Sequence, residues 1–134
     1  MKPIFFMLLA AIFSGCSSEA VSPDAVVLAV AFEWTQKDRG STENPEIRVS
    51  GIPEGTKRLF VELIDIDNPG FSHGGGFVAH DGSGIIRRGS IEGHYGGPNP
   101  PPPIIHSYEI TVKAMDMNGT IVGIGKMANA FPPG

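Results

Sequence analysis

Residues 106–115 read HSYEITVKAM, and their side chains alternate strictly in character. One set of alternate positions holds His106, Tyr108, Ile110, Val112 and Ala114, and the other holds Ser107, Glu109, Thr111 and Lys113. Because successive side chains of a β-strand point to opposite faces, the pattern predicts a strand with an apolar face toward a core and a polar face outward. An imidazole and a phenol stand at the beginning of the inward face.

A second alternating stretch, RLFVELID at residues 58–65, predicts the partner of this strand. Leu59, Val61 and Leu63 share a face with Asp65, which stands at the C-terminal end. The other face also carries apolar side chains, which favours a central position in a sheet. If the two strands run antiparallel, Asp65 meets His106 and Tyr108 at one end of the core.

The rest of the chain predicts further short strands joined by loops. The 18 glycines and 12 prolines favour turns over long helices. We expect strands over 26–34, 46–50, 77–79, 84–88 and 120–128, the last after an Asn118-Gly119 turn, and loops over 68–76, 89–97 and 98–103. The tail from Phe131 to Gly134 is not expected to continue a ladder. No amphipathic helix of useful length is evident, so the predicted fold class is an all-β sandwich.

The N-terminal residues predict export and lipid attachment. Lys2 precedes an unbroken apolar run over 4–13, which is too short to span a bilayer and is typical of a signal peptide. Residues 13–16 read FSGC and resemble the lipobox of bacterial lipoproteins, in which the cysteine is acylated. We therefore expect a signal peptide over 1–15, a lipid on Cys16, a tether over 16–25 and one domain over 26–134, held at the cell envelope on the periplasmic face of the outer membrane.

The charge balance excludes one class of partner. The formal net charge is −4 at pH 7, and no run of basic residues is present. Binding to the phosphate backbone of nucleic acids depends on clustered Lys and Arg, so the sequence predicts no nucleic-acid binding.

The predicted meeting of Asp65, His106 and Tyr108 is a candidate binding site. A buried carboxylate without partners is costly, so Asp65 needs a histidine, a tyrosine or backbone donors beside it. An imidazole, a phenolic hydroxyl and exposed backbone N–H groups of nearby glycines form a receptor suited to a small anion such as phosphate. The same cluster could equally be a satisfied polar group that closes the end of a sheet.

Four motifs in order along residues 41–116 resemble the phosphatidylethanolamine-binding protein family, in its bacterial Raf-kinase-inhibitor-like subgroup. NPEIRVSGIPEGTK at 44–57 resembles the family's S-P-x-L-S-W-S-G-V-P-E-G-T-K, and DIDNP at 65–69 resembles D-P-D-A-P. GHYGGPNPP at 93–101 resembles G-x-x-G-Y-G-G-P-x-P-P, and HSY with AMD at 106–108 and 114–116 resemble H-R-Y and A-L-D.

The resemblance implies a β-sandwich with an anion pocket at one end, which takes phosphate, acetate or a phosphoethanolamine headgroup. It implies pocket residues Asp65, Asp67, His106 and Tyr108, with a wall formed by Gly96, Gly97 and Pro98. We expect the N–H groups of Gly96 and Gly97 to donate to the anion.

Three departures from the family pattern alter this expectation. Aligning His80 with the family's Asn puts Gly75 in the place of a pocket histidine, and His73 is two residues upstream as a possible substitute. Val49 and Ile66 replace a usual Trp and Pro. After Asp116 the chain enters a turn where the family inserts a helix, so we expect a sandwich without the C-terminal helix and a more open pocket.

Other functions have weaker support in the sequence. The histidines His73, His80, His94 and His106 match no metal-binding spacing, and no G-x-S-x-G nucleophile motif is present. We therefore expect no metal, no cofactor and no catalysis, but binding of a small anion or phospholipid headgroup. The alternative is a protein-interaction or inhibitor module, with an envelope protease as the target and residues 98–103 as the contact.

Overall fold

The computed structural model describes residues 19–134, so the predicted signal peptide and Cys16 lie outside the described residues. Within the described part the elements follow in the order β1 (Val21–Val27), β2 (Ala29–Phe32), η1 (Gln36–Asp38), β3 (Ile47–Ser50), β4 (Arg58–Asp65), β5 (Ser72–Ala79), β6 (Ile85–Ile86), β7 (Glu92–Tyr95), β8 (His106–Met115) and β9 (Ile121–Phe131). The 3-10 turn η1 is the sole helical element of these residues.

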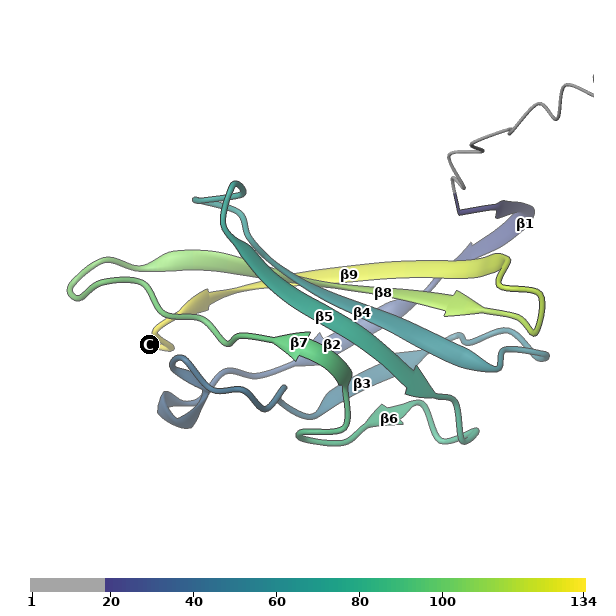
Figure 1. The fold of residues 1–134 in the computed structure, drawn as a ribbon, viewed down its shortest axis with the longest axis horizontal. Helices are drawn as coiled ribbons and strands as arrows, with labels where there is room; N and C mark the ends of the chain where they lie inside the picture. Colours follow the sequence, from purple (N-terminus) through teal and green to yellow (C-terminus); the bar gives the residue numbers. More distant parts are fainter. Residues whose placement is uncertain (1–18) are drawn as a thin grey trace, which may run out of the picture.

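The strands form two sheets that face each other (Figure 1). The larger sheet has the order β1-β9-β8-β4-β5-β7, and the smaller has the order β2-β3-β6. This confirms the predicted all-β sandwich without a C-terminal helix. No helix within residues 19–134 has the length and hydropathy that crossing a bilayer requires.

The two alternating stretches form neighbouring strands at the centre of the larger sheet. Strands β4 and β8 are antiparallel, and their register runs from Arg58 opposite Met115 to Asp65 opposite Tyr108. Strand β9 then pairs with the other edge of β8, and β5 with the other edge of β4. The predicted central position and both strand boundaries are confirmed.

The core lies between the two sheets and takes its side chains from the inward positions of each strand. Leu59, Val61 and Leu63 of β4 are at most 2% exposed, and Ile110 and Val112 of β8 are fully buried. The smaller sheet contributes buried side chains of the same kind, including Val30, Ile47, Val49 and Ile86. The predicted inward face of each long strand is therefore the face that packs.

The structure corrects the expected boundaries at the two ends of the domain. Residues 21–25, predicted to belong to a tether, lie in β1, which pairs in parallel with β9 at the edge of the sheet. The strand predicted over 26–34 is divided between β1 and β2. At the other end, β9 extends to Phe131, which pairs with His106. Phe131 is buried, and this burial explains why the ladder continues to the residue before Pro132.

Two predicted loops also contain strand. Residues 72–76 of the predicted loop 68–76 belong to β5, and residues 92–95 of the predicted loop 89–97 form β7. Glycines occupy residues 74–76 of the first stretch and residue 93 of the second, and glycine has a low propensity for strands. Here the glycines are required because the neighbouring backbones lie too close for a side chain.

A close approach between β9 and the residue that joins β1 to β2 determines where the smaller sheet begins. A Cβ atom at Gly125 of β9 would lie 2.4 Å from the carbonyl oxygen of Leu28. Leu28 joins β1 to β2, and its N–H donates to the carbonyl of Ile124. The absence of a side chain at Gly125 therefore lets the chain cross from the larger sheet to the smaller one.

The Gly125→Ala variant is expected to lose about 1–3 kcal/mol of unfolding free energy, because the added methyl group overlaps backbone atoms of Leu28. Urea denaturation of the purified protein measures this loss. Gly70→Ala is the matched control, since nothing lies within 4 Å of a Cβ there. Equal stability of the two variants would contradict the proposed close packing.

Candidate functional site

The three polar residues singled out by alternation meet at the end of the β4–β8 ladder. His106 Nδ1 lies 2.7 Å from Asp65 Oδ2. Tyr108 is opposite Asp65 in the register, and its ring lies 6.3 Å from that of His106. Asp65 and Tyr108 are buried, while His106 is partly exposed. The predicted convergence of carboxylate, imidazole and phenol is confirmed.

Asp65 has all the partners that a buried carboxylate needs. Its Oδ1 accepts hydrogen bonds from the N–H groups of Asp67 and Asn68, at 2.9 and 3.1 Å. Burial alone would raise the pKa of Asp65, but the hydrogen bond with His106 and the two backbone donors outweigh burial and lower it. Asp65 is therefore ionised at neutral pH and orients His106.

Tyr108 is held by its surroundings as well as by its hydroxyl group. The ring packs edge-on against Trp34 and His73, and the hydroxyl accepts a 3.3 Å hydrogen bond from the N–H of Asn99. Burial, supported by the neighbouring Asp65 carboxylate and opposed by the Asn99 N–H, raises the pKa of Tyr108 to about 12. The hydroxyl group is therefore protonated at physiological pH and retains one proton to donate.

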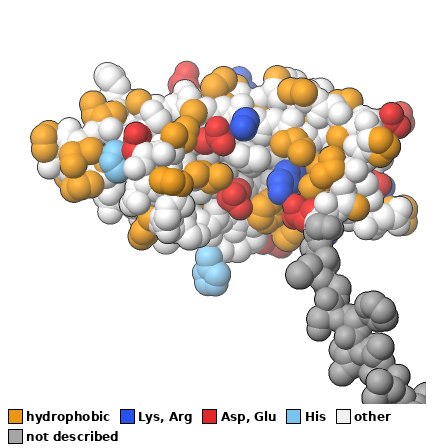
Figure 2. Space-filling model, turned by 90° about the horizontal axis from the view of Figure 1, so that it is seen from above, with side chains coloured by type: hydrophobic (Ala, Val, Ile, Leu, Met, Phe, Trp, Pro, Cys, Tyr) orange, Lys and Arg blue, Asp and Glu red, His pale blue; other side chains and the backbone are white. Residues whose placement is uncertain are grey.

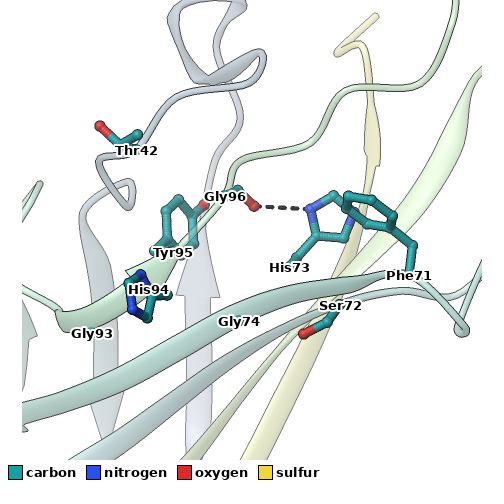
Figure 3. Close-up of a pocket in the computed structure, with 9 residues that line it drawn as sticks. All are labelled: Thr42, Phe71, Ser72, His73, Gly74, Gly93, His94, Tyr95 and Gly96. Atoms are coloured by element: carbon teal, nitrogen blue, oxygen red, sulfur yellow. Dashed lines mark hydrogen bonds between the residues drawn. The ribbon is translucent and has the colours of Figure 1, made fainter.

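His73 joins this cluster from β5. The side chain is 7% exposed, and its ring lies 5.3 Å from Tyr108 and 4.8 Å from Phe71. Its Nδ1 donates to the carbonyl oxygen of Gly96 at 2.9 Å, a bond drawn in Figure 3. The suggested substitution by His73 for the family's pocket histidine is thus consistent with its position.

The geometry of Gly75 explains why a histidine cannot stand there. Gly75 has a φ of +157°, and a Cβ at this position would lie 1.9 Å from the carbonyl oxygen of Val61. Strands β4, β5 and β7 approach each other closely at Gly75, which pairs with both Glu62 and His94. A side chain directed into the pocket must therefore leave β5 at another position, and His73 is such a position.

These residues line a cavity of about 430 Å³ at one end of the sandwich. Its lining consists of Gly40, Asp65, Asn68, Phe71, His73, Gly96, Gly97, Asn99, Pro100, Pro101, His106 and Tyr108. The volume is within the usual range for small-ligand sites. Sequence reasoning missed Gly40, Asn68, Phe71, Asn99, Pro100 and Pro101, which come from loops with no periodic pattern.

Two predicted ligand residues lie outside this lining. Asp67 is exposed, and its carboxylate accepts a 2.7 Å hydrogen bond from the N–H of Ser107, so it stabilises the start of β8. Pro98 is buried behind the wall, where its carbonyl accepts the N–H of Gly40. Both residues support the pocket without facing its interior.

Gly96 and Gly97 form a wall of the pocket, but the expected role of their N–H groups is wrong. The Gly96 N–H donates to the carbonyl of His73, and the Gly97 N–H donates to the carbonyl of Ser41. A Cβ at Gly97 would lie 2.3 Å from the carbonyl oxygen of Asp38, so this glycine allows two backbone segments to pack. Neither N–H group is available to an anion.

A second cavity of about 380 Å³, shown in Figure 3, adjoins the first at His73. It shares Phe71, His73 and Gly96 with the first and adds Tyr95 and His94 of β7. Burial raises the pKa of Tyr95, and among the described residues its hydroxyl is the one buried side-chain polar atom without a hydrogen-bond partner. Residues 19–134 contain no cluster of three or more His, Cys, Asp or Glu side chains that could hold a metal ion.

The Asp65→Asn variant is expected to lose about 1.5–3 kcal/mol of unfolding free energy at pH 7, since a charged hydrogen bond to His106 is removed. The folded-state pKa of Asp65 is lowered, so its contribution is present above the ordinary value of 3.8 and is lost as the pH falls through the lowered value. Chemical denaturation at neutral and acidic pH measures the difference, which should shrink below about pH 4. A pH-independent difference, or an equal loss in the exposed control Asp24→Asn, would contradict this assignment.

Comparisons with known proteins support the fold. No protein-family model matches the chain, and no curated protein matches it. A solved structure from Chlamydia trachomatis, described as a homologue of phosphatidylethanolamine-binding protein and named CT736, is similar with a TM-score of 0.56 and 16% identity, over 83% of this chain and 99% of that chain. Escherichia coli YbcL, described as a new member of the mammalian family of these proteins, is similar with a TM-score of 0.53 and 15% identity, over 80% of this chain and 99% of that chain. The resemblance expected from the four motifs is thus confirmed at the level of structure: this chain has the fold of phosphatidylethanolamine-binding proteins.

Proposed function

We propose that this protein binds, without catalysis, a small anion or a phospholipid headgroup of the phosphate or phosphoethanolamine type in the cavity at the end of the β4–β8 ladder. One observation carries the proposal: the Asp65–His106 pair, His73 and Tyr108 come from three strands and line the same cavity. The cavity leaves room for a ligand, whereas a polar pair that only closes the end of the sheet would leave none. The fold supports a binding role in general, and the chemistry of these side chains supports the specific ligand class.

Apolar side chains around the cavity mouth support a ligand with an apolar part. Ile66, Phe71, Ile104 and Ile105 are 47%, 59%, 48% and 63% exposed and lie on the two loops that border the cavity. We call these four residues the apolar collar. Figure 2 shows hydrophobic side chains gathered at this end of the molecule around a histidine. Exposed apolar groups that cluster beside a polar cavity are typical of a binding site.

Attachment to a membrane at Cys16 is a further part of the proposal, and the position of β1 in the sheet bears on its geometry. Strand β1 begins at Val21 opposite Ile121, at the end of the sheet where Arg58 pairs with Met115. The cavity is at the other end of these strands, about 25 Å away for a strand of this length. We propose that a lipid at Cys16 anchors the domain by the β1 side, with the cavity away from that surface, so that the ligand is a diffusing anion or the headgroup of another surface.

A protein-interaction role is the second candidate. Pro101, Pro102 and Pro103 are exposed and continue into Ile104 and Ile105 of the collar. A rigid, apolar and proline-rich loop is suited to contact with a protein, such as an envelope protease. Under this alternative the loop would bind and the cavity would stay without a ligand.

NMR titration of the purified protein with inorganic phosphate and with phosphoethanolamine tests the proposed function. We expect chemical-shift changes at His73, His106 and Tyr108, and at least a tenfold loss of affinity in His106→Ala because a direct contact is removed. His80→Ala is the control, since His80 follows β5 at the opposite end of the ladder. Shifts confined to other regions, or none at all with either ligand, would favour the protein-interaction role. Recovery of a chemically altered ligand would contradict the non-catalytic role.

A series of n-alkyl phosphates tests the role of the apolar collar. Affinity is expected to rise by up to about 0.8 kcal/mol, or about fourfold, for each methylene group that the collar buries. The double variant Ile104→Ser with Ile105→Ser should weaken this dependence on chain length and leave the affinity for inorganic phosphate unchanged. Calorimetry gives both quantities. If methyl and hexyl phosphate bind equally well, the collar does not contact the ligand.

A further inference from the structure

The cavity contains few hydrogen-bond donors for an anion. The N–H groups of Gly96 and Gly97 donate to backbone carbonyls, and the N–H of Asn99 donates to the hydroxyl group of Tyr108. A buried anion needs several donors, because each of its oxygens loses water on binding. The remaining donors come from side chains: the hydroxyl group of Tyr108, the amides of Asn68 and Asn99, and the two imidazoles. Among these lining residues only the imidazoles can become positively charged and so offset the charge of an anion.

In each imidazole ring, a neighbouring oxygen that can only accept a hydrogen bond determines which nitrogen carries the proton. His106 Nδ1 is 2.7 Å from the carboxylate of Asp65, and His73 Nδ1 is 2.9 Å from the carbonyl oxygen of Gly96. Nδ1 therefore carries the hydrogen in each ring. In a neutral imidazole the other nitrogen, Nε2, is then an acceptor only and repels an anion. Nε2 becomes a donor only when the ring takes up a second proton.

His73 differs from His106 in its charged neighbours. His106 faces the Asp65 carboxylate, whereas no carboxylate within residues 19–134 is at salt-bridge distance from His73. The titratable groups around His73 are Asp65 on β4, His106 and Tyr108 on β8, and His94 and Tyr95 on β7. Arg39 lies behind the cavity wall, where it donates to the carbonyl of Pro100 and covers the ring of Phe131. A bound anion would be the counter-ion that His73 lacks.

On the basis of the proposed function, we propose that the cavity takes up one proton with each anion, at Nε2 of His73. The ligand class is accordingly that of weak acids and monoanionic phosphates, which bind as anion and proton together. The proton comes from the buffer or from the acid form of the ligand, and the new N–H bond at Nε2 donates to the anion. The Nδ1–H bond to Gly96 stays in place throughout.

Calorimetry of the full chain with sodium acetate tests this coupling, because acetate keeps its charge between about pH 6 and about pH 8.5. Where the cavity without ligand does not carry this proton, affinity should fall about tenfold per pH unit, because each acetate takes up one proton. At about pH 8 the binding heat should differ between two buffers of different ionisation enthalpy, by the amount for one proton per acetate. Equal affinity across this pH range, with equal heats in both buffers, would overturn the inference. Failure to bind acetate or phosphate at any pH would instead contradict the proposed function.

The variant His73→Gln assigns the proton to one ring. The glutamine amide can place a fixed donor where Nε2 lies, so acetate should still bind, with a pH dependence that is lost. His80→Gln is the matched control and should keep the pH profile of the natural protein, since His80 is remote from the cavity. An unchanged pH profile in His73→Gln would overturn the assignment to His73. The imidazole ¹⁵N shifts of the natural protein provide a readout without mutation: Nε2 of His73 should change from unprotonated to protonated when acetate is added at about pH 8.

Discussion

Asp65 is the last residue of β4 and lies opposite Tyr108 in the antiparallel pairing with β8, so the register of this one ladder brings a carboxylate to the start of β8. A shift of one residue would turn Asp65 to the outer face and bring Ile64 into the core. The buried side chains Leu59, Val61 and Leu63 on the same face prevent such a shift. The apolar core and the polar site therefore depend on the same register, since one set of alternate positions contains both.

Close backbone packing determines which side chains reach the cavity. Gly75 and Gly97 each lie so close to a neighbouring carbonyl that neither position can carry a side chain. Their N–H groups and those nearby are used to hold strands and loops together, as the bond from Gly97 to Ser41 shows. The glycine-rich segments thus shape the cavity by packing, and under the proposed function the side chains of His73, His106 and Tyr108 contact the ligand.

The cavity combines a fixed negative charge with two imidazoles whose free nitrogens accept in the neutral state. Asp65 orients His106, and the carbonyl of Gly96 orients His73. Under the proposed proton uptake, such an arrangement would distinguish a ligand that binds together with a proton from one that binds as a charge alone. In the proposed function the apolar collar beside the cavity adds a second criterion, because it would favour a ligand whose polar group is attached to an apolar part.

The sequence by itself determined the two central strands, their boundaries and their inward faces. The reason is that successive side chains of a strand point to opposite faces, so the alternating apolar residues must all lie on the face that packs. It also placed Asp65, His106 and Tyr108 at the same end of the core. Only the tertiary structure decided that β5 includes Ser72 to Gly76, that His73 enters the cavity, and that Asp67 and Pro98 stand behind it. These outcomes depend on contacts between loops distant in the chain and on the space that neighbouring backbones leave. Neither these contacts nor this space can be read from a local pattern of residue types. For this reason the glycine-rich segments were predicted to be loops whose N–H groups donate to an anion.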